Sequence, residues 1–296
     1  MKKFGITGVA GYVAPRHLKA IKDTGNILIA AADPHDSVGI LDQYFPDAAF
    51  FTEIERFDRH LDKLRRNGEG IDYLSICSPN NLHDAHIRLA LRNDAHAICE
   101  KPLVLNPWNL DLLEKLEEEY NKKIYTILQL RVHPSLIKLK ESLESHKSTN
   151  KFKVDLTYIT SRGKWYDYSW KGDIQKSGGI ATNIGIHFFD LLIWLFGKVI
   201  HQTVTFNAIN KMRGELELEF ADVNWFLSLD KDDLPVDVVK NGRATYRSIK
   251  INGEEIEFTD GFNDLHTEVY KRTLSGNGFT LTDARPSIEL VYRLRK

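Results

Sequence analysis

The chain has 296 residues, of which 42% are hydrophobic and 27% are charged. This length exceeds what one hydrophobic core usually organises, so we expect two domains. Forty lysines and arginines against 41 aspartates and glutamates leave a formal net charge of -1. That balance gives no electrostatic reason to expect nucleic acid as a partner.

The sequence also bears on the cellular compartment and on membrane association. The N-terminal residues run straight into a strand-like segment, without the long apolar stretch and cleavage site of a signal peptide. No apolar run in the sequence reaches the roughly 18 to 20 residues that cross a bilayer. Cys77 and Cys99 are the only cysteines, too few for a disulfide framework and without the spacing of a metal site. We therefore expect a soluble cytoplasmic protein with no metal and no membrane partner.

The first predicted element is a short apolar strand that runs into a glycine-rich turn at 3–14. Gly8, Gly11 and Ala14 follow one another at intervals of three, a variant of the dinucleotide motif with one more residue between its first two small positions. Glycines let the backbone approach a pyrophosphate, and a helix predicted at 12–24 would direct its N-terminal amides at it. Such turns are common, so the motif does not decide the matter alone.

The second predicted strand, 27–32, ends at Asp33. This is about the right distance along the chain for the carboxylate that binds a ribose 2′-hydroxyl group. Together with the glycine turn it predicts a dinucleotide site. A carboxylate there would repel a 2′-phosphate, which favours NAD over NADP. The alternative is that Asp33 only forms a turn before Pro34.

Strands and helices continue to alternate as far as residue 130. We predict a helix that ends at Asn67-Gly68. The elements predicted after it are strand 71–77, turn 78–81, helix 82–93, a strand from residue 97, a helix that begins at Pro107, and strand 123–130. Apolar strands separated by helices imply a doubly wound parallel sheet in an α/β Rossmann domain, residues 1–130. Ser78, Asn80 and His83 follow a strand and would line the cofactor, or serve only as turn residues.

The strand from residue 97 reads Ala-Ile-Cys-Glu-Lys-Pro and ends in a carboxylate, an ammonium group and a proline. Pro102 lacks a backbone donor, so the strand stops there and presents Glu100 and Lys101 at its carboxyl end. Ligands of open α/β sheets bind at that end. We therefore favour a functional role for Lys101 over that of an ordinary surface lysine.

From about residue 150 the pattern changes to that of strands with one exposed face. Apolar and polar residues alternate at 152–158, and similar segments follow at 203–208, 215–220, 223–229, 245–251 and 254–258. Asn252-Gly253, between the last two, is a strong hairpin signal. Successive strands without intervening helices predict a mostly antiparallel, open-faced sheet in an α+β domain for substrate binding and oligomerisation, residues 131–296, with helices at 263–275 and 283–295.

Two polar stretches stand out in this second half. Residues 162–173 place four aromatic residues among bases and glycines, a combination that stacks on a base or sugar and pairs with phosphates and carboxylates; the alternative is a structural loop with buried rings. Asn183, His187 and Asp190 share one face of a predicted helix. A lone histidine there would usually be a core residue, but the flanking polar pair favours a site.

The glycine turn, the Glu100-Lys101-Pro102 strand end and the Gly-Ile-His-x-x-Asp segment at 185–190 resemble the Gfo/Idh/MocA oxidoreductases in order and spacing, over nearly the whole chain. Within that family, residues 8–17, 128–134, 162–166, 169–173 and 183–190 are similar to the WbpB/WlbA group, UDP-N-acetyl-glucosaminuronate 3-dehydrogenases of bacterial surface-polysaccharide (O-antigen) synthesis. The resemblance implies oxidation of the 3-hydroxyl of a UDP-sugar acid, tightly held NAD that 2-oxoglutarate reoxidises in place, and a homotetramer built through the open face of the second-domain sheet.

The resemblance also implies roles for individual residues. The catalytic residues would be Lys101, which stabilises the developing alkoxide, His187, which takes the proton, and Asn183. Family members commonly carry Asp at the last position; because asparagine cannot accept a proton, Asn183 is left as a positioner, and the base is His187 or a Lys101 with a lowered pKa.

The remaining contacts implied by the resemblance fall into two sets. The cofactor-binding residues would be Gly8, Gly11, Tyr12, Val13, Ala14, Asp33, Ser78, Asn80, His83, Glu100, Lys101 and Gln129. The substrate-binding residues would be Arg16, His17, Arg131, Arg162, Lys164, Trp165, Tyr166, Lys171, Asn183 and His187. Two alternatives remain open: another sugar or inositol dehydrogenase of the same family, and an NAD-binding regulatory protein without turnover.

Overall fold

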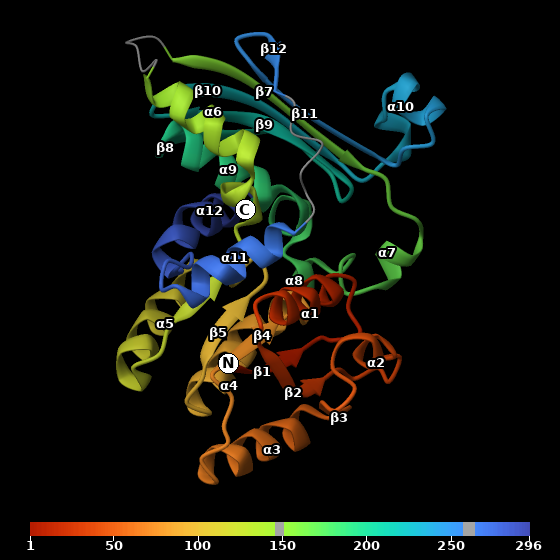
Figure 1. Ribbon diagram of the computed structural model, residues 1–296. Helices are drawn as coiled ribbons and strands as arrows, with labels where there is room; N and C mark the ends of the chain where they lie inside the picture. Colours follow the sequence, from red (N-terminus) through yellow and green to blue (C-terminus); the bar gives the residue numbers. More distant parts are fainter. Residues whose placement is uncertain (146–150, 257–263) are drawn as a thin grey trace. The chain divides into compact units, whose positions relative to one another are not determined.

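The computed structural model describes residues 1–145, 151–256 and 264–296, and the chain divides into two compact units (Figure 1). The first unit comprises Met1–Gln129 and Asp264–Arg285, and the second comprises Leu130–Asn263 and Pro286–Lys296. The predicted division near residue 130 appears in the structure, but the segment Asp264–Arg285, which we assigned to the second domain, belongs to the first unit.

The first unit is built on a parallel sheet of six strands in the order β3-β2-β1-β4-β5-β6. Its strands are β1 (Lys3–Thr7), β2 (Ile27–Ala32), β3 (Ala49–Phe51), β4 (Tyr73–Ile76), β5 (His96–Cys99) and β6 (Ile124–Thr126). Its helices are α1 (Ala14–Asp23), α2 (Ile40–Tyr44), α3 (Ile54–Arg66), η1 (Asn80–Leu82), α4 (His83–Arg92), α5 (Pro107–Tyr120) and α11 (Leu265–Leu274). The strand order reverses between β1 and β4, which is where doubly wound sheets bind ligands. The predicted Rossmann fold is confirmed.

One strand of this sheet is shorter than predicted. Strand β6 ends at Thr126, whereas the sequence pattern extended it to residue 130. The chain turns there into the 3₁₀ helix η2 (Gln129–Val132), and Pro134 opens helix α6 (Pro134–Ser145) directly afterwards. A proline is well suited to the first turn of a helix, so the apolar run is divided between a strand and two helical turns.

The returning segment Asp264–Arg285 is bound to the first unit along its length. Helix α11 packs against α1, where Asp264 pairs with Lys19 at 2.9 Å. Tyr270 is fully buried and stacks on Phe4 of the first strand, with ring centroids 5.9 Å apart. Past the helix, the backbone amide of Thr126 donates to the carbonyl oxygen of Phe279 at 2.9 Å, which continues the sheet edge.

The second unit contains a mixed sheet in the order β12-β11-β7-β10-β9-β8. Its strands are β7 (Phe152–Thr160), β8 (Val199–Asn207), β9 (Lys211–Leu218), β10 (Ala221–Ser228), β11 (Thr245–Ile251) and β12 (Glu254–Glu255). The pairs are antiparallel except β7 with β10, so the prediction of a mostly antiparallel sheet is confirmed. The positive φ angles of Asn252 and Gly253, 52° and 88°, give the expected hairpin. Residues 257 and 258 of the last predicted strand lie outside the described residues.

The helices of the second unit are mostly short. They are α6, α7 (Trp165–Tyr168), α8 (Ile174–Ser177), the π-helical turn η3 (Ala181–Gly185), α9 (Ile186–Phe196), η4 (Lys231–Asp233) and α10 (Val236–Lys240). Helix α12 (Leu281–Leu294) crosses the boundary between the two units.

A helical stretch at 174–196 is long and apolar enough to span a membrane, which corrects our expectation that no such run exists. Its most apolar window is 78% buried within the structure. In helix α9, Phe189 is fully buried and meets Trp225 of β10 edge to face, with ring centroids 5.3 Å apart. The stretch is therefore a core helix that covers one face of the second sheet.

Candidate functional site

The glycine turn after β1 is held against the end of β4. Gly8 has a φ of +77°, and a Cβ atom added there would lie 2.5 Å from the backbone of Cys77 and 2.6 Å from the amide of Ser78. Only glycine fits such an approach. Helix α1 then begins at Ala14, and its N-cap residue Val13 makes no side-chain cap bond. The Ala14 amide donates to the carbonyl oxygen of Gly11 at 3.1 Å, the Arg16 amide donates to that of Val13 at 3.0 Å, and Pro15 has no N–H group. The start of α1 therefore attracts an anion through the positive end of the helix dipole rather than through free amides.

Asp33 connects the end of β2 to this turn. Its side chain is buried, and Oδ2 accepts a hydrogen bond from the backbone amide of Ala10 at 2.9 Å. The other oxygen, Oδ1, accepts from the amide of His35, also at 2.9 Å. The turn-forming bond considered in the sequence analysis is therefore present. The carboxylate also lies against the glycine turn, and each oxygen retains a lone pair for a hydroxyl group.

The turns that follow β4 and β5 are joined by one imidazole. His83 is buried, and its ring nitrogens lie 2.7 Å from the carbonyl oxygen of Pro102 and 2.9 Å from that of Ser78. Burial lowers the pKa of His83, so the neutral ring donates to one of these two oxygens. Ser78 and Asn80 are buried beside it. His83 thus fixes the two strand ends relative to each other.

The other residues predicted to bind the cofactor or substrate in this unit differ in exposure. Tyr12 is 85% exposed in the glycine turn, and the Arg16 guanidinium lies 5.5 Å from the centre of its ring. Gly11 bonds back to the carbonyl oxygen of Gly8 at 3.0 Å. The side chains of Lys101, shortly after β5, and Gln129, the first residue of η2, are half-buried.

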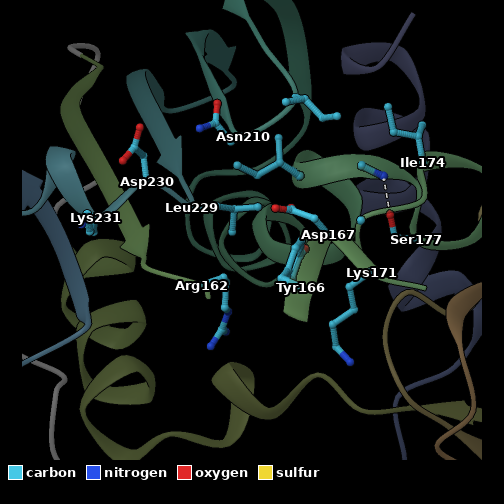
Figure 2. Close-up of a pocket in the computed structure, with 14 residues that line it drawn as sticks. Arg162, Tyr166, Asp167, Lys171, Ile174, Ser177, Asn210, Leu229, Asp230 and Lys231 are labelled. Carbon is cyan, nitrogen blue, oxygen red and sulfur yellow. Dashed lines mark hydrogen bonds between the residues drawn. The ribbon is translucent and has the colours of Figure 1, made fainter. Parts of the chain in front are cut away.

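The second unit contains a cavity of about 290 Å³ at the predicted aromatic and basic stretch (Figure 2). Arg162, Tyr166 and Lys171 line it, and the two cationic side chains flank the tyrosine and extend in the same direction in Figure 2. Burial, and the nearby charge of Arg162, lower the pKa of Lys171. Neither cation forms an ion pair with any residue in the described ranges. Asp167 and Asp230 also line the cavity, but neither forms an ion pair with these two cations, and Asp230 pairs with Lys211 at 3.1 Å. Arg162 and Lys171 therefore remain available to an anionic ligand.

The rest of the aromatic stretch lies around this cavity. The Lys171 ammonium group is 4.5 Å from the ring centre of Trp170 and 5.7 Å from that of Trp165. Lys164 and Trp165 are exposed and do not line the cavity. The opposite wall includes Asn210 and Asp230, which the sequence analysis missed. They follow β8 and β10, and only the strand order of the sheet brings them here.

Asn183 links the cavity to the π-helical turn before α9. Its side-chain amide donates to the hydroxyl group of Tyr166 at 2.8 Å, and both side chains are buried. Gly185 permits this turn to lie close to the sheet, since a Cβ atom there would be 2.6 Å from Leu227 Cδ1. His187 follows in the first turn of α9, with a half-buried ring. π-helical turns are rare in proteins, and those that do occur often lie at functional sites.

Arg131, predicted to bind substrate, is already paired. Its Nε and terminal nitrogen donate to the two carboxylate oxygens of Asp190 at 2.9 and 2.8 Å, and both side chains are nearly inaccessible to solvent. This fork-to-fork geometry neutralises the guanidinium charge. Arg131 therefore anchors η2 to α9 through Asp190, which stands three residues after His187.

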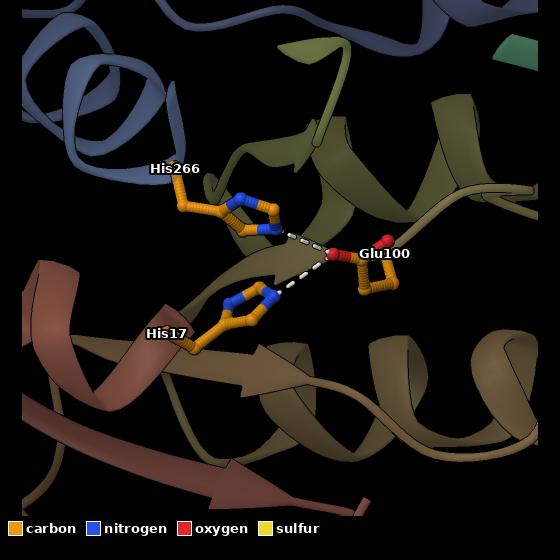
Figure 3. A group of neighbouring side chains, drawn as sticks. All are labelled: His17, Glu100 and His266. Atoms are coloured by element: carbon orange, nitrogen blue, oxygen red, sulfur yellow. Dashed lines mark hydrogen bonds and ion pairs between the residues drawn. The ribbon is translucent and has the colours of Figure 1, made fainter. Parts of the chain in front are cut away.

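A buried polar network lies at the end of β5 in the first unit. Glu100 Oε1 is 3.0 Å from His17 Nε2 and 2.9 Å from His266 Nε2 (Figure 3). Glu100 directly follows β5, and the two histidines come from α1 and α11. Burial opposes ionisation of Glu100, but the hydrogen bonds from His17 and His266 outweigh it and hold the pKa of Glu100 well below its ordinary range. Sequence reasoning missed His266 because it stands more than 160 positions after Glu100.

This network gives His17 a different position from the one expected of a substrate ligand. The ring is fully buried, and its second nitrogen, Nδ1, lies 2.7 Å from the hydroxyl group of Tyr270. Both ring nitrogens are thus engaged inside the protein. The ligand atoms of His17, Glu100 and His266 lie within 4.8 Å of one another. The contacts to Glu100 have hydrogen-bond lengths, so no ion is needed to hold the group together.

Comparisons with known proteins cover nearly the whole chain. Residues 2–127 match an oxidoreductase family model described as an NAD-binding Rossmann fold, and residues 140–291 match the C-terminal alpha/beta domain of the same family. The WlbA (WbpB) dehydrogenase of Thermus thermophilus is 54% identical over 100% of this chain and 95% of its own, with a TM-score of 0.97. It was crystallised with NAD and alpha-ketoglutarate, and with NAD and UDP-GlcNAcA.

Curated relatives are more distant. Glucose-6-phosphate 3-dehydrogenase of Bacillus subtilis is 25% identical over 66% of this chain and 54% of its own length. Inositol 2-dehydrogenase of Rhizobium meliloti is 26% identical over 66% of this chain and 55% of its own length. The chain thus spans about half the length of these curated relatives.

We expect Gly8→Ala to weaken NAD binding about 10-fold or more, because the new Cβ must push the turn away from the end of β4. Gly25→Ala is the matched control: Gly25 also has a positive φ, +71°, but no atom lies within 4 Å of an added Cβ. Calorimetric titration with NAD checks both variants. Equal NAD affinity in the two would contradict the role given to the turn.

Proposed function

Because the chain belongs to the Gfo/Idh/MocA oxidoreductase family, we propose that it is an NAD-dependent dehydrogenase that oxidises the 3-hydroxyl group of a UDP-N-acetyl-glucosaminuronate-type sugar to the 3-keto sugar. The observation that carries the choice of substrate is the cavity with Arg162 and Lys171, two cations that form no ion pair among the described residues, in a chain so similar to a dehydrogenase crystallised with such a sugar. In this proposal the enzyme acts in the bacterial cytoplasm, in surface-polysaccharide synthesis, as a homotetramer.

The first unit supplies the cofactor site. The glycine turn and the positive end of the α1 dipole would bind the pyrophosphate of NAD, and the free lone pairs of Asp33 would accept from a ribose hydroxyl group. Gly8 keeps the turn close enough to the end of β4 for that approach. When bound, NAD supplies the hydride acceptor that oxidation of a secondary alcohol requires.

The second unit supplies the substrate site. A UDP-sugar acid carries a diphosphate and a carboxylate, and Arg162 and Lys171 offer two cations whose charge is not neutralised within the described chain. Guanidinium and ammonium groups bind both kinds of anion. The aromatic rings beside Lys171 provide apolar surfaces on which a sugar or a base can pack. Free sugars and inositols lack these charges.

Lys101 and His187 would carry the chemistry. An ammonium group stabilises negative charge that develops on the 3-oxygen, and a neutral imidazole can accept the hydroxyl proton. Asn183 cannot take that proton, and its hydrogen bond to Tyr166 gives it a positioning role. After the reaction 2-oxoglutarate would reoxidise the bound NADH, as its presence in the Thermus complex suggests.

A second candidate is another sugar dehydrogenase of the family, which the curated relatives that act on glucose 6-phosphate and inositol favour. Measuring cofactor reduction with UDP-GlcNAcA, glucose 6-phosphate and myo-inositol separates the two. The proposal requires UDP-GlcNAcA to have the highest kcat/KM, and a clear preference for either of the other compounds would replace it.

We expect Lys101→Ala to lower kcat about 100-fold or more, because the charge that stabilises the alkoxide is lost. NAD affinity should stay within about 3-fold of wild type, since the glycine turn and Asp33 are unchanged. Lys22→Ala, on the surface of α1, serves as the control. Steady-state kinetics with UDP-GlcNAcA checks the prediction, and a Lys101→Ala enzyme with wild-type turnover would remove Lys101 from the mechanism.

Replacing Arg162 or Lys171 by methionine should raise the KM for UDP-GlcNAcA about 10-fold or more, because each variant removes a charge-assisted contact. The affinity for NAD should not change. Lys176→Met is the control, since Lys176 lies nearby and is paired with Asp173 at 3.7 Å. If both cavity variants kept the wild-type KM, the substrate would have to bind elsewhere.

Asp33→Ala should weaken NAD binding about 10-fold and narrow the preference for NAD over NADP, because the carboxylate that accepts from the ribose and repels a 2′-phosphate is gone. Asp36→Ala, an exposed neighbour, should leave both affinities unchanged. Fluorescence titrations with the two cofactors measure the effect. If Asp33→Ala kept the wild-type preference for NAD over NADP, Asp33 would have only a turn-forming role.

A further inference from the structure

The buried network around Glu100 has no part in the chemistry described so far. Five of its side chains come from four separate segments of the first unit and are at most 7% exposed; they are His17, Ser75, Glu100, His266 and Tyr270. Burying this many polar groups is costly unless each hydrogen bond is made. Such a network fixes one arrangement of the segments that contribute to it.

We propose that His17 and His266 are positioning residues, which hold the Glu100 carboxylate in place beneath the strand end that carries Lys101. The inference rests on the proposed function, in which Lys101 acts on the substrate, and it identifies how the fold fixes that lysine. Figure 3 shows both imidazoles directed at the same oxygen of Glu100 from opposite helices.

The hydrogen bonds of the network have a defined direction. An ionised carboxylate only accepts, so the Nε2 atoms of His17 and His266 must both carry protons. Burial lowers the pKa of His17 despite the opposing hydrogen bond to Glu100, so its ring is neutral and Nδ1 is an acceptor. Tyr270 therefore donates to His17 at 2.7 Å, and its oxygen accepts from Ser75 at 2.6 Å. The chain of donors runs from Ser75 to the carboxylate.

The second oxygen of Glu100 connects this network to the lysine. Oε2 accepts from the backbone amide of Lys101 at 3.2 Å, so the carboxylate holds the peptide group that immediately precedes the Lys101 side chain. If the carboxylate moves, that amide moves with it. Displacing a catalytic group by about 1 Å can cost about 100-fold in rate.

A metal site is the competing reading, because two imidazoles and a carboxylate are common ligands of Zn²⁺. The hydrogen-bond reading accounts for both ring nitrogens of His17: Nε2 is 3.0 Å from Glu100 and Nδ1 is 2.7 Å from Tyr270. Elemental analysis of the purified protein distinguishes the two readings. One Zn²⁺ per chain that disappears in a His266→Leu variant would overturn the proposal.

The kinetic test compares two replacements of His266 in the NAD-bound enzyme. His266→Leu removes the donor to Glu100, whereas His266→Gln retains an N–H group that can reach it. We expect the Leu variant to lose about 10-fold or more in kcat, with the KM for UDP-GlcNAcA within about 2-fold, and the Gln variant to recover most of the loss. A Leu variant that melts at a lower temperature but keeps its kcat would overturn the proposal, as would a loss that Gln does not rescue.

A second measurement does not depend on turnover. The rate at which acetic anhydride acetylates Lys101 in the NAD-bound protein, followed by peptide mass spectrometry, reports the surroundings of the amine. We expect this rate to change about 3-fold or more in His266→Leu and to return in His266→Gln, while exposed Lys115 reacts equally in all proteins. An unchanged Lys101 rate would overturn the positioning role. If the wild-type enzyme does not oxidise UDP-GlcNAcA, the proposed function fails. The labelling experiment would still show whether the network around Glu100 positions Lys101.

Discussion

The first unit depends on one buried carboxylate. Glu100 is almost inaccessible to solvent and accepts from two imidazoles and a backbone amide. Without those donors it would be a buried charge with no partner, which proteins do not tolerate. The donors come from the first helix and from a helix near the end of the chain, so satisfying this one group requires distant parts of the sequence to meet. The same carboxylate borders the strand end where Lys101 emerges.

Local sequence patterns predicted the local structure well. The glycine turn, the strands at 3–7 and 27–32 and the hairpin at Asn252-Gly253 each depend on neighbours along the chain, and the structure contains all of them. At Asp33 the structure contains the turn-forming bond that the sequence analysis gave as the alternative, and Arg162 and Lys171 of the predicted aromatic and basic stretch line one cavity. The ligand roles of these three residues stay predictions. In these cases the residue type and its place at a strand end carry the information.

What the sequence could not predict depends on contacts between distant segments. Nothing near residues 264–285 indicates that they belong with the first sheet, and the Glu100 partner His266 therefore stayed hidden. The parallel pairing of β7 with β10 brings Asp230 to the cavity wall, which spacing along the chain does not reveal. Likewise, the polar stretch around Arg131 predicted a ligand, but the guanidinium is bound by Asp190, 59 positions later.

The return of residues 264–285 to the first unit has a consequence for how the protein is made. The ribosome completes strands β1 to β6 long before it reaches His266 and Tyr270. Until then, the nascent Rossmann sheet lacks the contact of Tyr270 with Phe4 and the hydrogen bond of His266 to Glu100. Its folding therefore cannot finish domain by domain in the usual N-terminal-first manner. A ribosome that stalls or terminates before codon 264 leaves an immature sheet whose carboxylate at the ligand-binding edge lacks the His266 donor, a ready substrate for chaperones and proteases.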